Sequence, residues 1–132
     1  GESCFQSKIA KMINELENKK LCFQSNGAKV VDLGLESPLI LEKSGGGYLY
    51  HTTDLACLQE RLAEFSKIIY VVDSRQSLHF KLLFAAAEKF GWLKSQEVLH
   101  IDFGTINGND NKPFKTRSGG VLKLSDLINS AI

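Results

Sequence analysis

The sequence predicts an α/β fold in which a parallel β-α-β core lies beside a small antiparallel layer. Residues 68–72 form a continuous apolar run rich in β-branched side chains, which is typical of a parallel strand buried on both faces. A second strand-like run covers 97–103, and a helical pattern over 77–90 supplies the crossover between them. Short extended runs between 21 and 50, separated by turn residues, predict the antiparallel layer. A length of 132 residues suits one domain.

The first predicted helix covers residues 3–21. Ser3 and Gln6 fit a capping box at its start. Lys19 and Lys20 fit its last turn, where cations interact favourably with the helix dipole. Four apolar side chains recur at helical spacing and predict the buried face of a packing helix: Ile9, Met12, Ile13 and Leu16.

The antiparallel layer is predicted from short runs and clear turns. The extended runs lie at 21–24, 29–33, 39–41 and 48–50. Asn26 and Gly27 mark one turn, and the three glycines at 45–47 mark another. The glycines lack the GxxxxGK[ST] pattern of a phosphate loop, so a hairpin turn is favoured.

The second predicted helix covers residues 52–66. Thr52 or Thr53 can cap its start, and Asp54 then lies in its first turn. Its apolar stripe consists of Leu55, Leu58, Leu62 and Phe65. The third helix, 77–90, is apolar on two sides and is therefore expected to be central, and Gly91 ends it.

A basic loop follows the second core strand. Lys112, Lys115 and Arg117 place three cations within six residues, and two glycines follow them. Such a loop beyond the carboxyl end of a strand suits the binding of a polyphosphate, although charge alone equally allows a solvated turn. Further on, 121–124 is predicted to be extended and 126–132 to be helical.

The composition argues against several classes of protein. A formal charge of +1 gives no broad basic field for nucleic acid. Three cysteines without CxxC spacing argue against a zinc site and fit a reducing compartment, the cytoplasm. No histidine pair has metal-ligand spacing, so no bound metal is expected. No apolar run approaches the ~18 residues of a membrane span.

Four phrases, taken together and in this order, resemble the catalytic domain of arginyl-tRNA synthetases, a class I aminoacyl-tRNA synthetase family. They are GES at 1–3, GGGYLYHTTDLAC at 45–57, YVVDSRQSLHF at 70–80 and KPFKTRSGG at 112–120. The resemblance implies that the basic loop is this family's form of the class I KMSKS signature. The half of the domain that carries the HIGH signature has no counterpart. We therefore expect residues 1–132 to be a fragment of a single Rossmann-like catalytic domain.

The resemblance also implies roles for individual residues. Tyr50, Asp54 and Gln76 match positions that hold the substrate arginine. A carboxylate can accept the planar donors of a guanidinium, and a tyrosine ring can pack on it.

For ATP, the resemblance places an adenine site near Phe103 and Gly104. His79 is a secondary candidate near the nucleotide, and Lys112 and Lys115 are expected at its phosphates. The catalytic candidates are Lys115 and Arg117, which would stabilise the leaving pyrophosphate. The loop departs from the standard signature, so the resemblance does not decide which of its cationic residues contacts the pyrophosphate. Mg²⁺ is expected only together with ATP.

The function that follows from the resemblance is part of an arginine–tRNA ligase, with arginine, ATP and tRNA(Arg) as partners of the parent enzyme. The fragment alone is expected to be inactive. Removal of the other half should also expose an apolar face or edge of the central sheet near 68–72, so the fragment is expected to self-associate. Two alternatives stay open. One is a stand-alone, non-catalytic module that binds a nucleotide or arginine, and the other is a structural domain with a basic loop.

Overall fold

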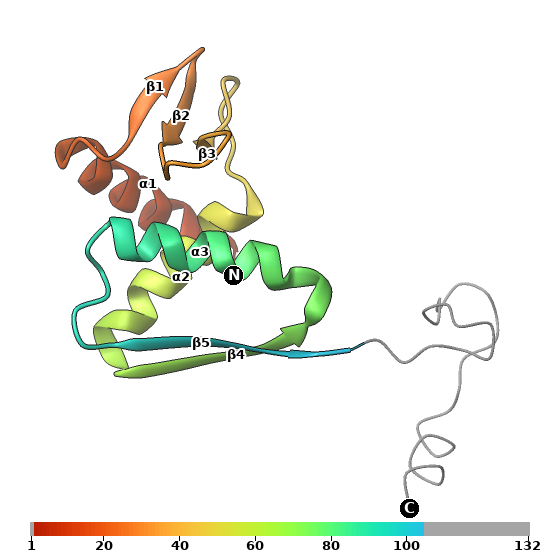
Figure 1. The fold of residues 1–132 in the computed structure, drawn as a ribbon. Coiled ribbons are helices and arrows are strands. Elements are labelled where there is room, and N and C mark those ends of the chain that lie inside the picture. The colour runs from red at the N-terminus through yellow and green to blue at the C-terminus, as the bar shows by residue number, and fades with distance from the viewer. Residues whose placement is uncertain (1, 105–132) are drawn as a thin grey trace, which may run out of the picture.

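The computed structural model describes residues 2–104 of the protein (Figure 1). The basic loop and the elements expected at 121–124 and 126–132 lie outside these residues. The described elements are α1 (Glu2–Asn18), β1 (Phe23–Ser25), β2 (Ala28–Val31), β3 (Leu39–Glu42), α2 (Tyr50–Glu64), β4 (Lys67–Asp73), the 3₁₀ turn η1 (Ser74–Gln76), α3 (Ser77–Lys89) and β5 (Glu97–Phe103). Within this part of the chain, no helix is long and apolar enough to cross a membrane.

Helix α1 packs through the face that the sequence predicts. Its four apolar side chains are almost completely buried: Ile9, Met12, Ile13 and Leu16. Its bounds differ from the prediction. The helix begins at Glu2, so Ser3 lies inside it, and it ends at Asn18, before Lys19 and Lys20. Lys20 adopts a left-handed backbone with φ of 58°, and the amides of Leu21 and Cys22 then donate to the Leu16 carbonyl, which turns the chain back toward the core.

The predicted antiparallel layer is confirmed as a three-stranded sheet in the order β1-β2-β3. Asn26 and Gly27 have φ of 49° and 79°, the positive values that a two-residue hairpin turn of type I′ requires. The glycine segment forms the second turn, where the Gly46 amide donates to the Lys43 carbonyl over 2.9 Å.

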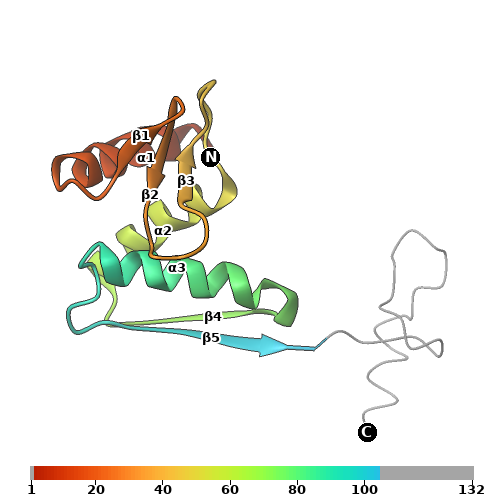
Figure 2. The same cartoon turned by 45° about the horizontal axis from the view of Figure 1, so that its top comes forward.

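The predicted parallel pair of strands is confirmed. Strands β4 and β5 pair from Lys67 with Glu97 to Asp73 with Phe103. The run at 68–72 is typical of a strand buried on both faces, but β4 is buried on one face only, in line with the exposed face expected of the fragment. Ile68 is buried, whereas Ile69 and Val71 are 47% and 61% exposed. The physical reason is that the helices lie on one side of this strand pair, and no described element covers the other side (Figures 1 and 2).

Helix α3 is central, as expected. In both views it lies between the β4–β5 pair and the antiparallel sheet (Figures 1 and 2). Phe80, Leu83, Ala86 and Ala87 are buried, but Leu78 at its start is 70% exposed. Gly91, with φ of 72°, follows the helix and allows the amide of Trp92 to donate to the Ala87 carbonyl.

The connection from β3 to α2 corrects one boundary that matters for the site. Tyr48 forms an isolated bridge with Glu42, and the helix already begins at Tyr50, so 48–50 is not a strand. Leu49 precedes the helix with an extended backbone, and no side-chain hydrogen bond caps the start of the helix. Neither Thr52 nor Thr53 is the cap, because both lie inside the helix, where Thr52 is fully buried.

Candidate functional site

The first turns of α2 present Tyr50 and Asp54 on one face. Tyr50 is the first residue of the helix and Asp54 the fifth, so the pair has the i, i+4 spacing of neighbours on a helix surface. The expectation that Asp54 lies in the first turn is wrong, because the helix begins two residues earlier than predicted. Tyr50 is 92% exposed, which leaves its ring free to pack on a ligand.

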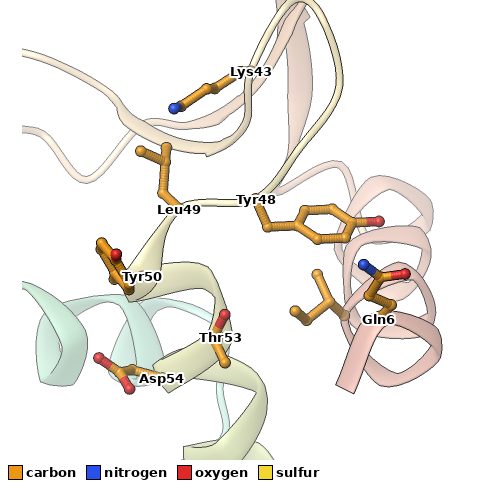
Figure 3. A pocket seen from close by; sticks show the side chains of 8 residues that line it. Gln6, Lys43, Tyr48, Leu49, Tyr50, Thr53 and Asp54 are labelled. Atoms are coloured by element: carbon orange, nitrogen blue, oxygen red, sulfur yellow. The ribbon is translucent and has the colours of Figure 1, made fainter. Parts of the chain in front are cut away.

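A pocket of about 560 Å³ lies against this face, between α2, α1 and the β3–α2 connection (Figure 3). Its described lining residues are Gln6, Ile9, Lys43, Tyr48, Leu49, Tyr50, Thr53 and Asp54. Figure 3 shows the ring of Tyr48 turned toward Gln6 on α1. Sequence reasoning missed Gln6, Lys43, Tyr48 and Thr53 as site residues. No spacing pattern pointed to them, because the predicted helix began at 52 and left Tyr50 in an extended run.

Asp54 also connects α2 to the start of α3. Its Oδ2 accepts a hydrogen bond from His79 Nε2 at 2.8 Å, and the side chains are 48% and 29% exposed respectively. The imidazole packs edge-on against Phe80, with ring centroids 5.2 Å apart. His79 therefore lies beside a predicted arginine ligand. Its expected place near the nucleotide stays a prediction.

The carboxyl ends of the two parallel strands meet, because Asp73 pairs with Phe103. Asp73 accepts hydrogen bonds from the guanidinium and the backbone amide of Arg75, and these bonds hold the pKa of its carboxyl below the ordinary value. Gln76 ends the short turn that follows and is exposed. Among the described residues, no heavy atom lies within 4 Å of where a Cβ on Gly104 would be, so this part of the chain leaves the backbone there open.

The described residues thus bring part of the predicted site together. Tyr50 and Asp54 share the pocket, and His79 joins them through Asp54. Gln76 precedes His79 by three residues but is not among the described residues that line the pocket. Phe103 and Gly104 lie at the end of β5. The predicted loop residues Lys112, Lys115 and Arg117 lie outside the described residues.

Chemically, the pocket suits a ligand with a planar cation. Asp54 offers a carboxylate whose Oδ2 is already oriented, and the phenol of Tyr50 offers an exposed ring four residues away. A guanidinium can donate to such a carboxylate and stack on such a ring. The described residues contain no group of three or more His, Cys, Asp or Glu side chains that could hold a metal ion.

Comparison with known proteins identifies the family. The family described as "tRNA synthetases class I (R), catalytic domain" matches residues 1–132. The chain belongs to this family. The resemblance drawn from the four phrases is therefore confirmed at the level of the family, and so is the α/β fold class.

Individual relatives agree with the family. The chain is 44% identical over 98% of its length to the "Arginine--tRNA ligase" of Marinomonas sp. (strain MWYL1), and 46% identical over its whole length to that of Rhodopirellula baltica. It spans 24% and 20% of these two relatives.

Solved structures give the same result. The crystal structure of arginyl-tRNA synthetase from Plasmodium falciparum matches with a TM-score of 0.71 and 29% identity, over 98% of this chain and 22% of that one. A putative arginyl-tRNA synthetase from Campylobacter jejuni also matches with a TM-score of 0.71. At 16% identity, over 97% of this chain and 29% of that one, it shows the fold alone.

Proposed function

We propose that the chain is part of an arginine–tRNA ligase. In the proposed reaction, a carboxylate oxygen of arginine attacks the α-phosphorus of ATP, and pyrophosphate leaves to give arginyl-adenylate. A hydroxyl at the 3′ end of tRNA(Arg) then takes the arginyl group, and AMP leaves. The family match supports this reaction class, and the names of the relatives support arginine as the amino acid.

The observation that carries the choice of arginine is the shared face of Tyr50 and Asp54 in the pocket. We assign Asp54 to the guanidinium, because a charge-assisted bidentate contact is directional and strong. Tyr50 provides a ring for the same group. Gln76, exposed at the carboxyl end of β4, is the third proposed contact.

The nucleotide is proposed to lie at the carboxyl ends of β4 and β5, where ligands of open α/β sheets bind. Phe103 and Gly104 would face the adenine, and Lys112 and Lys115 the phosphates. Lys115 and Arg117 would stabilise charge on the leaving pyrophosphate. The reaction needs correctly positioned substrates and charged groups, and it needs no protein nucleophile. Mg²⁺ would arrive as part of the ATP complex.

The 132-residue chain alone is proposed to be inactive. The pocket against α2 supplies contacts to the amino acid, but a phosphoryl-transfer site also needs preorganised groups around the phosphates. We expect the parent enzyme to work in the cytoplasm, where its tRNA is found.

ATP–pyrophosphate exchange tests the proposal on both forms of the protein. With tRNA(Arg) supplied, the full-length protein should exchange pyrophosphate only when arginine is present, and lysine and citrulline at the same concentration serve as matched controls. The 132-residue chain should be indistinguishable from a blank. Arginine binding without exchange by the full-length protein would favour the alternative of a non-catalytic binding module.

A further inference from the structure

We propose that His79 is a positioning residue that acts on arginine through Asp54. This inference rests on the proposed function of the pocket as an arginine site. His79 donates to Oδ2 of Asp54 at 2.8 Å and would orient the carboxylate so that Oδ1 and the free lone pair of Oδ2 meet the guanidinium. This role differs from a contact with the nucleotide.

The location of His79 supports an indirect role. Asp54 is among the described residues that line the pocket, and His79 is not. The two side chains come from different helices, α2 and α3, so the hydrogen bond also ties the face that carries Tyr50 to the start of α3. A substitution of His79 should therefore change the orientation of Asp54 without removing a direct contact to arginine.

The imidazole is itself held by the core. It packs edge-on against Phe80, which is buried. Phe80 in turn lies against Tyr70 of β4 and His100 of β5, with ring centroids 4.7 and 5.0 Å apart. The parallel strands are thereby linked through Phe80 and His79 to the carboxylate. An acceptor held in place in this way loses less rotamer entropy when a ligand binds than a freely rotating one.

The first test compares two substitutions in the full-length protein. His79→Leu removes the donor, whereas His79→Gln keeps an amide donor near the position of Nε2. In arginine-dependent pyrophosphate exchange, His79→Leu should raise the KM for arginine by about tenfold, because a hydrogen bond to a charged group is lost. The KM for ATP should change by less than about twofold, and His79→Gln should recover most of the loss. Leu78→Ala, at the exposed neighbour on α3, is the matched control and should leave both constants unchanged.

A second test asks whether the effect passes through Asp54. In an Asp54→Asn background, adding His79→Leu should change the KM for arginine by less than about twofold, because the carboxylate it orients is gone. A fully additive loss, or a rise in the KM for ATP instead of arginine, overturns the inference. The unchanged KM for ATP excludes a simple folding defect. If the wild-type protein shows no arginine-dependent exchange, the proposed function fails. In that case the dissociation constant for arginine, measured by calorimetry on the same variants, decides this inference. His79→Leu should raise it by about tenfold in the wild-type background and by less than about twofold in the Asp54→Asn background.

Discussion

Thr52 on α2 donates a hydrogen bond from Oγ1 to the backbone carbonyl of Leu41 on β3 at 2.7 Å, and both residues are completely buried. The neighbouring His51 contacts the Ile40 carbonyl through Nε2. Two successive side chains therefore fix the start of α2 to the end strand of the antiparallel sheet. Because Tyr50 and Asp54 lie on the same helical turns, this attachment sets the position of the candidate site.

Replacing Thr52 should weaken the fold. Thr52→Val keeps the shape but removes the hydroxyl, so the Leu41 carbonyl loses this partner in a buried position. We expect the free energy of unfolding of the 132-residue chain to fall by about 1–3 kcal/mol in urea denaturation. Thr52→Ser retains the donor and should lose less. Equal stability of the valine variant and the wild type would show that the bond contributes nothing.

The core could be predicted from the sequence because its signals are local. The apolar run at 68–72, the helix pattern after it and the strand-like run at 97–103 together predict a parallel pair. The apolar run itself indicates burial on both faces, and the exposed face was expected only because the chain was interpreted as a fragment. Ile69 and Val71 fit a two-sided buried strand by composition, yet the described elements cover only the face that carries Ile68.

The site was only partly predictable. Tyr50 and Asp54 came from the family resemblance. The sequence 48–50 is a short aromatic and apolar run that follows a turn and is typical of a strand, and this composition concealed the start of the helix. The contact between Asp54 and His79 joins residues 25 positions apart on two helices, so no spacing rule reports it. Gln6 enters the pocket only because α1 packs beside α2, a tertiary contact that periodicity leaves undetermined.

The uncovered face of the parallel strands should cause self-association of the 132-residue chain. Ile69 and Val71 on β4, with Ile101 and Phe103 on β5, are all about half exposed or more. Val71 pairs with Ile101 in register, so these two form a continuous apolar patch. We expect a second copy of the chain to cover it, and light scattering at increasing concentration should show species larger than the monomer.

The paired substitution Val71→Lys with Ile101→Lys places two like charges on this patch and should shift the chain toward the monomer. Leu35→Lys is the matched control, because Leu35 is an exposed apolar residue in the β2–β3 connection, away from this face. If the control reduces association as strongly as the pair, the β4–β5 face is not the contact surface.

The basic loop should affect turnover of the full-length protein. We expect kcat for arginine activation to fall by about 100-fold in each of the variants Lys115→Ala and Arg117→Ala, and the KM for arginine to stay unchanged. Interactions made mainly in the transition state affect kcat rather than KM. Thermal stability should change little, since loop-borne polar residues contribute little to packing. Lys94→Ala, at an exposed lysine before β5, is the charge-matched control. If both variants activate arginine at the parental rate, the predicted loop is a basic turn with no catalytic role.

Asp54→Ala in the full-length protein tests most directly the claim that the pocket against α2 selects arginine. Pyrophosphate exchange at varied arginine should show a KM raised by about 10- to 150-fold, which corresponds to the loss of about 1.5–3 kcal/mol from a charged partner of the guanidinium. The KM for ATP should change much less. Glu64→Ala, which removes an exposed carboxylate at the far end of the same helix, should leave both constants unchanged. An unchanged KM for arginine in a folded Asp54→Ala protein would contradict the account.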